Sequence, residues 1–349
     1  MCDLYMKDPD ARIRQCLLSS PVTYSTDLEL INAPVIMEYV NNFSTIEEFD
    51  SISSNVWRMP LYYKNFDIAE YVLDKCTTDE ELQRAGHELA VWARRPESVG
   101  DLPARTCATP AELGRCCEVV FTVITSSADV EGVALGKDGL SEGMAPGSVL
   151  IDCSTIAPES ARHVAACLAE KGIDMLDAPV SGGVQGAIDA TLAIMIGGEA
   201  DVLERVRPLL DCLGKRIVHV GPNGAGQVAK ACNQMIMVAA IEAAAEAMRL
   251  ATASGVDAAR VRQALAGGSA ASRVLDVMGE RMVRRDFSAG IEARLHHKDF
   301  GLVLEAARQS GVPVALTAAV AQQLNALMAQ GWGRQETAVL LRVLERSGQ

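Results

Sequence analysis

Strand and helix patterns alternate along the middle of this 349-residue chain, from about residue 86 to residue 222. Two predicted helices, Pro158–Lys171 after a Ser154–Thr155 cap and Ala200–Leu213, lie between short runs that are rich in Val and Ile. Repeated strand–helix–strand units predict a mostly parallel sheet with helices on both faces, which is a doubly wound α/β domain. The predicted strands are His87–Trp92, Val119–Thr125, Ser148–Cys153, Asp174–Asp177, Leu192–Ile196 and Arg216–Val220.

The strand pattern stops at Gln227, and residues 223–349 are predicted to form an all-helical domain. Val228–Ser254 is predicted to be one helix, about 40 Å long at a rise of 1.5 Å per residue. It is apolar nearly all round, so a second domain and a second subunit should cover it, which predicts a homo-oligomer, a dimer or a tetramer. Further helices are predicted at Ala258–Ala266, Ala271–Arg284, Lys298–Ser310, Leu316–Gln330 and Glu336–Glu345.

The composition changes near residue 85, because all 28 glycines lie at or after Gly86 whereas all six tyrosines lie between Tyr5 and Tyr71. Residues 1–85 are predicted to be an atypical, partly helical segment, and we find no chemistry in it. Its predicted parts are a helix capped by Asn65, a short helix with a Thr78–Glu81 capping box, and an apolar run, Pro34–Phe43, that fits strand or helix. The change indicates that two different pieces of protein are joined, as in a fusion, a gene rearrangement or an engineered chimera.

The composition excludes several classes of function. A hydrophobic content of 49% is ample for packed cores, whereas a net charge of -13 argues against nucleic acid, which needs clustered Lys and Arg. The apolar runs are too short or too interrupted by charge to span a membrane, and the acidic start is unlike a signal peptide. The ten cysteines form no Cys-x-x-Cys pair and the five histidines are scattered, so we expect reduced thiols and no metal site. A cytoplasmic enzyme fits best.

A serine and two glycines follow the strand that ends near Asp177: Ser181, Gly182 and Gly183. Ligands of open α/β sheets bind at the carboxyl ends of strands, and a hydroxyl with successive bare amides can hold an anion. These three residues are therefore candidates for binding a small carboxylate. The alternative interpretation is a tight turn.

An amine and an amide lie at the start of the long apolar helix. Lys230 and Asn233 are three residues apart and so share one helix face, and the neighbours of the lysine are apolar. A lysine in such surroundings can donate a proton to a substrate carbonyl oxygen, and the asparagine can orient the substrate or hold the amine. Taken alone, Lys230 would be interpreted as a surface lysine.

Two further polar groups are candidates for holding a cofactor. Arg94 and Arg95 follow a predicted strand at the position where nucleotide-binding sheets distinguish a free ribose hydroxyl from a 2′-phosphate, and arginine suits the phosphate. The alternative is a solvated charge pair in a loop. The second group, His296–Asp299, precedes the helical pattern that begins with Phe300. Either these residues cap that helix, or Lys298 reaches a cofactor.

Four motifs together resemble the β-hydroxyacid dehydrogenases, the group that includes 3-hydroxyisobutyrate dehydrogenase and tartronate semialdehyde reductase. The resemblance runs from about Leu82 to the C-terminus and rests on Asp152–Pro158, Asp177–Gly183, Gly224–Asn233 and Leu295–Asp299. It implies a Rossmann-type NADP-binding domain and an NADP(H)-dependent oxidoreductase that interconverts a small 3-hydroxy acid and its semialdehyde. NAD remains possible as the cofactor.

The resemblance also implies roles for single residues. Lys230 is the implied general acid or base with Asn233 as its partner, and Ser181, Gly182 and Gly183 bind the substrate carboxylate. The implied cofactor contacts are Ile124, Thr125, Thr155, Lys298 and Arg94. Asn-Gln after the lysine is more similar to tartronate semialdehyde reductase, whereas the 3-hydroxyisobutyrate enzymes more often have Asn-Asn. Ala93 stands where many members have an asparagine.

The chain departs from the family at its start. Members begin with a strand and a Gly-x-Gly-x-x-Gly turn whose amides meet the cofactor pyrophosphate, and no glycine precedes Gly86 here. We therefore expect the first strand and this turn to be absent or replaced, and NADPH binding to be weak. Three hypotheses follow: an active reductase completed by the foreign segment, a relic that acts only as a binding or structural protein, and an imine reductase, which Lys230 argues against.

Overall fold

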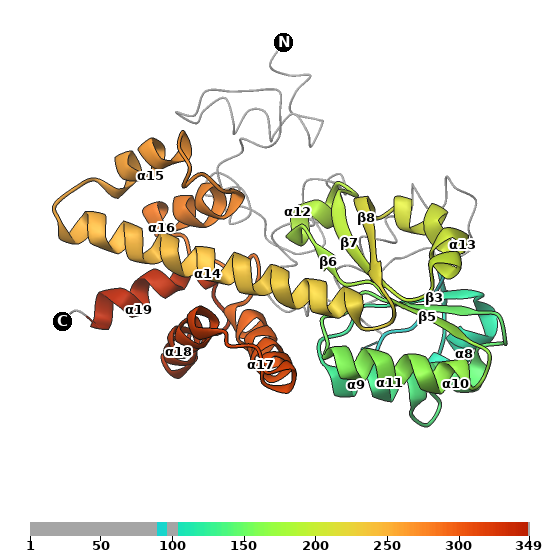
Figure 1. Ribbon diagram of the computed structural model, residues 1–349. Coiled ribbons are helices and arrows are strands. Elements are labelled where there is room, and N and C mark those ends of the chain that lie inside the picture. Colours follow the sequence, from blue (N-terminus) through green and yellow to red (C-terminus); the bar gives the residue numbers. More distant parts are fainter. Residues whose placement is uncertain (1–88, 96–103, 348–349) are drawn as a thin grey trace, which may run out of the picture. The chain divides into compact units, whose positions relative to one another are not determined.

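The computed structural model describes residues 89–95 and 104–347, which belong to one compact unit (Figure 1). Three predicted parts lie outside the described residues: Pro34–Phe43, the helix capped by Asn65 and the Thr78–Glu81 helix. The start of the predicted strand His87–Trp92 also lies outside them. No helix in the described ranges, including the longest one, is long and apolar enough to cross a membrane.

The described strands form two sheets. β1 (Ala90–Val91) pairs in parallel with β2 (Arg105–Thr106), and this pair is separate from a six-stranded sheet. The larger sheet has the order β3-β4-β5-β7-β6, with β8 beside β7. Its strands are β3 Val119–Thr122, β4 Val149–Asp152, β5 Asp174–Asp177, β6 Val180–Ser181, β7 Leu192–Gly197 and β8 Gly214–Gly221.

The larger sheet is mixed but mostly parallel, as predicted. β3, β4 and β5 are parallel neighbours, and so are β7 and β8, but β7 runs antiparallel to both β5 and β6. The reason lies in the connection between β6 and β7, where the chain forms only α12 (Gly183–Ile188). A parallel return needs a crossover of a dozen or more residues, so this six-residue helix returns the chain antiparallel.

Helices cover the larger sheet on both sides, as predicted for a Rossmann-type domain. Figure 1 shows α9, α10 and α11 on one side of the strands and α13 on the other. The core between α11 and the sheet contains Leu150, Val164, Leu168 and Ile173, each of which is 1% exposed or less. The helices of this part are α8 Pro110–Cys116, α9 Ser127–Leu135, α10 Leu140–Gly143, α11 Pro158–Ala169 and α13 Ala200–Asp211.

Ser154 has a different role from the helix cap that the sequence predicts. α11 begins after Ala157, and no side chain caps it. The Ser154 hydroxyl donates to the Asp152 carboxylate at 2.6 Å and accepts from the backbone N–H of Ile124 at 2.8 Å. β3 ends at Thr122 rather than at Thr125, and Ser154 joins the ends of β3 and β4.

The long helix α14 (Ala225–Ala253) begins a turn earlier than predicted, because Asp177 at the end of β5 caps it. The two carboxylate oxygens accept from the backbone N–H groups of Gly224 at 2.7 Å and Gln227 at 3.0 Å. These amides have no partner within the helix, and the carboxylate supplies one. Gly226 permits the close approach, since a Cβ there would lie 2.4 Å from the backbone oxygen of Met195.

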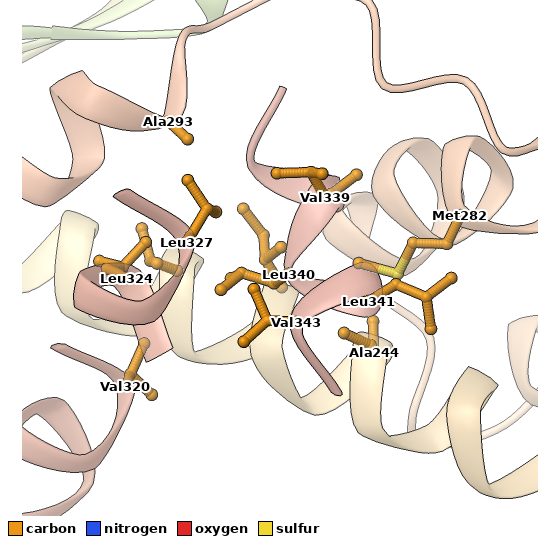
Figure 2. Close-up of a cluster of buried hydrophobic side chains, with 14 of the residues drawn as sticks. Ala244, Met282, Ala293, Val320, Leu324, Leu327, Val339, Leu340, Leu341 and Val343 are labelled. Carbon is orange, nitrogen blue, oxygen red and sulfur yellow. The ribbon is translucent and has the colours of Figure 1, made fainter. Parts of the chain in front are cut away.

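The helical domain packs around α14. Figure 2 shows Leu340 and Leu341 pointing into the core, near Leu324 and Leu327 of another helix and Met282 of a third. Burial of such side chains contributes about 1.5–3 kcal/mol each. The helices that follow α14 are α15 Ala258–Ala266, α16 Glu280–Arg284, α17 Ala293–Ser310, α18 Ala315–Ala329 and α19 Leu340–Ser347.

The predicted helices Ala271–Arg284 and Glu336–Glu345 differ from the observed ones. The helix predicted over Ala271–Arg284 begins with a cap, since the Ser272 hydroxyl accepts from the Leu275 N–H, and includes a π-helical turn, η3 (Leu275–Gly279), before α16. Glu336 caps a short 3₁₀ turn, η4 (Thr337–Val339), so α19 begins only at Leu340.

α17 starts five residues before the predicted Lys298. The backbone N–H groups of Ala293 and Arg294 donate to the carbonyls of Gln335 and Gly333. A loop from the far end of the domain thus satisfies the first turn of α17, and no local sequence signal reports such a contact.

Candidate active site

The predicted carboxylate-binding residues lie on β6 and at the turn after it. Ser181 ends β6 and is partly buried, while Gly182 and Gly183 are exposed and have φ values of 148° and 63°. Both values lie in the region that favours glycine. A Cβ at Gly182 would also lie 3.0 Å from Leu192, so the bare backbone is required here.

Lys230 comes from the second turn of α14 and reaches this strand. Its Nζ donates to the backbone carbonyl of Val180 at 2.8 Å, directly before Ser181, and the residue is only 9% exposed. Burial lowers the pKa of Lys230 from 10.5 to about 8, while the Asp299 carboxylate raises it and the Lys298 ammonium lowers it further. The interpretation of Lys230 as a surface lysine is therefore wrong.

Asn233 faces Ser181 rather than the lysine amine. Its Oδ1 accepts from the Ser181 hydroxyl at 3.4 Å, and its Nδ2 donates to Oε1 of Gln234 at 2.9 Å. Among the described residues, the Lys230 amine bonds to Val180 and not to Asn233. The structure thus brings Ser181, Lys230 and Asn233 together, with the amide next to the serine.

Lys298 lies within α17, one turn from its start, so the expectation that His296–Asp299 precede the helix is wrong. Its Nζ donates to the backbone carbonyls of Thr125 at 3.0 Å and Thr155 at 2.6 Å. These residues follow β3 and β4, and Ile124 lies beside them. Lys298 therefore joins the helical domain to the carboxyl ends of two neighbouring strands, where open α/β sheets bind ligands.

Arg94 and Arg95 follow β1 and are exposed. The Arg94 side chain is 68% exposed, and its guanidinium forms an ion pair at 3.7 Å with Asp129, in the first turn of α9. Both the solvated-pair interpretation and the phosphate interpretation of Arg94 remain compatible with this geometry. Such an exposed pair contributes little to stability.

Two glutamines at the site, Gln227 and Gln234, were missed by the sequence reasoning, and Asp299 was identified there only as part of the group His296–Asp299. The Gln227 side chain bonds to the Ser154 carbonyl and the Ile156 N–H. Gln234 donates to Asp299 at 2.5 Å, and Asp299 pairs with Lys298 at 2.8 Å. The signal was present, because Gln227, Lys230 and Gln234 recur at helical spacing on one face of an apolar helix.

His296 is buried in α17, two residues before Lys298, and has a structural role. One ring nitrogen lies 2.7 Å from the Thr337 hydroxyl. Burial lowers the pKa of His296 to about 4, so the ring is neutral at physiological pH. His296 joins α17 to η4 through this hydrogen bond and cannot act as a general acid at pH 7.

Known protein families match both parts of the chain. Residues 79–221 match the family described as the NAD binding domain of 6-phosphogluconate dehydrogenase. Residues 224–344 match the NAD-binding domain of NADP-dependent 3-hydroxyisobutyrate dehydrogenase. The 2-hydroxy-3-oxopropionate reductase of Escherichia coli (strain K12) is 40% identical over 266 residues, which are 76% of this chain and 91% of the relative. The chain belongs to the β-hydroxyacid dehydrogenase family. It is an oxidoreductase, and its cofactor is a nicotinamide dinucleotide.

Other members of this family are also similar. The NAD-dependent L-serine dehydrogenase of Pseudomonas aeruginosa is 40% identical over 235 residues, 65% of this chain and 79% of the relative. A solved structure of Mycobacterium tuberculosis 3-hydroxyisobutyrate dehydrogenase with L-serine has a TM-score of 0.71 at 28% identity, covering 79% of this chain and 94% of that one. The family therefore contains members with different substrates and different cofactor preferences.

The described residues fit two parts of a dinucleotide. Thr125, Thr155 and Lys298 lie at the carboxyl edge of the sheet, where open α/β sheets bind ligands, and Arg94 lies exposed after β1, so these residues could hold two parts of a dinucleotide. A Gly-x-Gly-x-x-Gly turn for the pyrophosphate is not among the described residues, and no glycine precedes Gly86 in the sequence.

Proposed function

We propose that this protein reduces a small 3-oxo acid to its 3-hydroxy acid with NADPH, and catalyses the reverse reaction with NADP⁺. The substrate that we favour is 2-hydroxy-3-oxopropanoate. The observation that carries the proposal is the Lys230 amine, which is buried beside Ser181 and within 2.8 Å of the Val180 carbonyl. The 40% identity to a 2-hydroxy-3-oxopropionate reductase and the Asn233-Gln234 pair support the choice of substrate.

The substrate carboxylate would bind to the Ser181 hydroxyl and the backbone amides of Gly182 and Gly183. An ionised acceptor makes short, strong hydrogen bonds, so this turn would fix one end of the substrate. On carboxylate binding the Ser181 hydroxyl would turn from Asn233 to the ligand, since it has one proton to donate. The amide of Asn233 would then orient the hydroxyl at C2 of the substrate.

Lys230 would act as the general acid in reduction. A bound nicotinamide dinucleotide supplies the hydride that reaches the carbonyl carbon. The Lys230 Nζ would release the Val180 carbonyl and donate its proton to the substrate oxygen as negative charge develops there. A pKa of about 8 suits this role, because the amine is mostly protonated at pH 7 and yet gives up its proton readily.

Arg94, with Arg95 beside it, would hold the 2′-phosphate of NADPH, and Ile124, Thr125, Thr155 and Lys298 would line the nicotinamide half. Arginine recognises phosphate through two parallel hydrogen bonds, whereas a free ribose hydroxyl gives it no anion to pair with. We therefore propose NADP(H) rather than NAD(H) as the preferred cofactor.

A second candidate substrate is 2-methyl-3-oxopropanoate, the oxidised form of 3-hydroxyisobutyrate. The match to the Mycobacterium tuberculosis 3-hydroxyisobutyrate dehydrogenase supports it. The two substrates differ only in a hydroxyl or a methyl group at C2, so the polar side chain of Asn233 near Ser181 favours the hydroxyl compound.

The purified protein tests the proposal with both semialdehydes and both cofactors. We expect NADPH oxidation with 2-hydroxy-3-oxopropanoate and a higher kcat/KM than with the methyl compound. Lys230→Met should abolish turnover and leave NADPH binding within about threefold of the wild type, since the amine does not hold the cofactor. NADPH fluorescence should report saturable binding, weaker than in relatives that have the glycine-rich turn. A wild type that binds no NADPH, or a Lys230→Met variant with full turnover, would refute the proposal.

A further inference from the structure

An unbroken series of polar contacts links the two halves of the site. The Ser181 hydroxyl donates to Asn233, Asn233 donates to Gln234, and Gln234 donates to one oxygen of Asp299. The other Asp299 oxygen pairs with Lys298, whose Nζ donates to the loops after β3 and β4. We call Asn233, Gln234, Asp299 and Lys298 the relay.

The negative charge of Asp299 fixes the orientation of both amides in the relay. A carboxylate only accepts hydrogen bonds, so Asp299 requires the Nε2 group of Gln234 to face it. The Oε1 atom of Gln234 must then face Asn233, which presents Nδ2 in turn. As a result the Oδ1 atom of Asn233 faces Ser181, and the polarity at the substrate turn is set by a carboxylate in another helix.

The relay is shielded from water over its central members. Gln234 is 3% exposed and Asp299 is 6% exposed, and both line a small pocket together with Thr155 and Ala231. Hydrogen bonds in such surroundings are electrostatically stronger than in water, and an unpaired member is costly. If a residue at one end of the relay moves, the residues at the other end therefore have to move with it, because water cannot replace the hydrogen bonds that would be lost.

The Lys298 end of the relay lies where a bound cofactor would contact it. Lys298 holds the backbone carbonyls of Thr125 and Thr155, which follow neighbouring strands at the carboxyl edge of the sheet. A dinucleotide at this edge would compete for, or reinforce, the contacts of the Lys298 ammonium. Any shift of that ammonium changes how far it neutralises the Asp299 carboxylate, and so changes the strength of the hydrogen bond that Asp299 accepts from Gln234.

We propose that Gln234 and Asp299 are positioning residues that couple occupation of the loops after β3 and β4 to the Ser181–Asn233 side, so that cofactor and small carboxylate bind cooperatively. This inference rests on the proposed function. Neither residue needs to touch the reacting atoms. The relay sets the direction in which Asn233 and Ser181 present their donors before substrate arrives.

The test measures binding with a pair of ligands that cannot react with each other. NADPH and 2,3-dihydroxypropanoate are both reduced, so the dissociation constant of NADPH can be titrated with and without saturating hydroxy acid. We expect the hydroxy acid to tighten NADPH binding by about fivefold or more in the wild type, within the usual range of coupling. In Gln234→Met, which keeps the side-chain length but removes both hydrogen bonds, the factor should fall below about twofold.

Two further variants separate the relay from a packing effect. Gln263→Met, at an exposed position of α15, is the matched control and should keep the wild-type coupling. Gln234→Glu can restore the relay only when its carboxyl group is protonated, because that form donates to Asp299 and accepts from Asn233. Burial and the neighbouring Asp299 carboxylate raise the pKa of such a carboxyl group, so relative to the wild type at the same pH its coupling should weaken as pH rises from 6 to 8. Packing alone does not produce this dependence.

The outcomes distinguish the two proposals. A wild type that binds neither ligand refutes the proposed function and the relay with it. A wild type that binds both ligands with coupling below twofold overturns the relay alone. Retention of full coupling by Gln234→Met, or coupling of Gln234→Glu that does not change with pH, also overturns it.

Discussion

Replacing the buried lysine should stabilise the protein while it removes the activity. Lys230 is 9% exposed, and burial lowers its pKa from 10.5 to about 8. A shift of one pKa unit corresponds to about 1.4 kcal/mol, so burying the charged rather than the neutral amine costs about 3 kcal/mol. Methionine has a similar length and no charge, and Lys230→Met removes this cost.

The gain is reduced by one lost contact. The Lys230 Nζ donates to the Val180 carbonyl, and a hydrogen bond of this kind contributes about 1 kcal/mol net. We therefore expect Lys230→Met to raise the free energy of unfolding at pH 7 by about 2 kcal/mol, or the Tm by about 3 °C for a chain of this size. Scanning calorimetry of the wild type and the variant measures the difference.

The pH dependence gives the sign of the effect independently. The unfolded chain binds the Lys230 proton more tightly than the folded chain, because the pKa is 10.5 in the first and about 8 in the second. Stability from this group therefore rises with pH between about 8 and 10.5, by about 2 kcal/mol at pH 9.5. The advantage of Lys230→Met should nearly vanish at that pH.

The control is Lys215→Met, at an exposed position of β8, which should shift the Tm by less than about 1 °C at either pH. The reasoning is refuted if Lys230→Met is no more stable than the wild type at pH 7, or if its advantage is the same at pH 9.5. Either result would mean that the lysine is paired or solvated in the folded protein.

Other predictions concern the pH profile, the cofactor and the packing of α14. The kcat/KM for reduction should fall as pH rises above about 8, because reduction needs the Lys230 ammonium. The kcat/KM for oxidation should fall as pH drops below about 8, because oxidation needs the free amine. Profiles that do not change with pH would exclude Lys230 as this acid. Arg94→Ala should weaken NADPH binding about tenfold, or about 1.4 kcal/mol, and leave NADH within about threefold, with the exposed Arg260→Ala as control; equal losses for both cofactors would argue against a 2′-phosphate site. Gly226→Ala should destabilise the protein by about 2–3 kcal/mol in urea unfolding, since its Cβ would lie 2.4 Å from a backbone oxygen of β7. The control is Gly301→Ala, which has open space around it and should be neutral or stabilising by up to about 1 kcal/mol.

The local helix signals were most reliable where the cap is local. α15 has the predicted bounds, Ala258–Ala266, because the Asp257 side chain beside it accepts from the Ala259 N–H. α14 and α17 begin earlier than predicted, because Asp177 on β5 and the carbonyls of Gly333 and Gln335 bind their first amides. Caps that come from distant segments leave no signal in the adjacent residues.

The candidate site divides in the same way. The sequence determined the two-part fold class, the family and the turn with Ser181, because periodicity, glycines and a buried-context lysine are local properties of the chain. Only the tertiary structure decided that Lys230 reaches the Val180 carbonyl. It also decided that Asn233 presents its oxygen to Ser181, an orientation that Gln234 and Asp299 set. The physical reason is that hydrogen-bond polarity and pKa depend on which groups meet across the interior, and Gln234 and Asp299 are 65 residues apart in the chain.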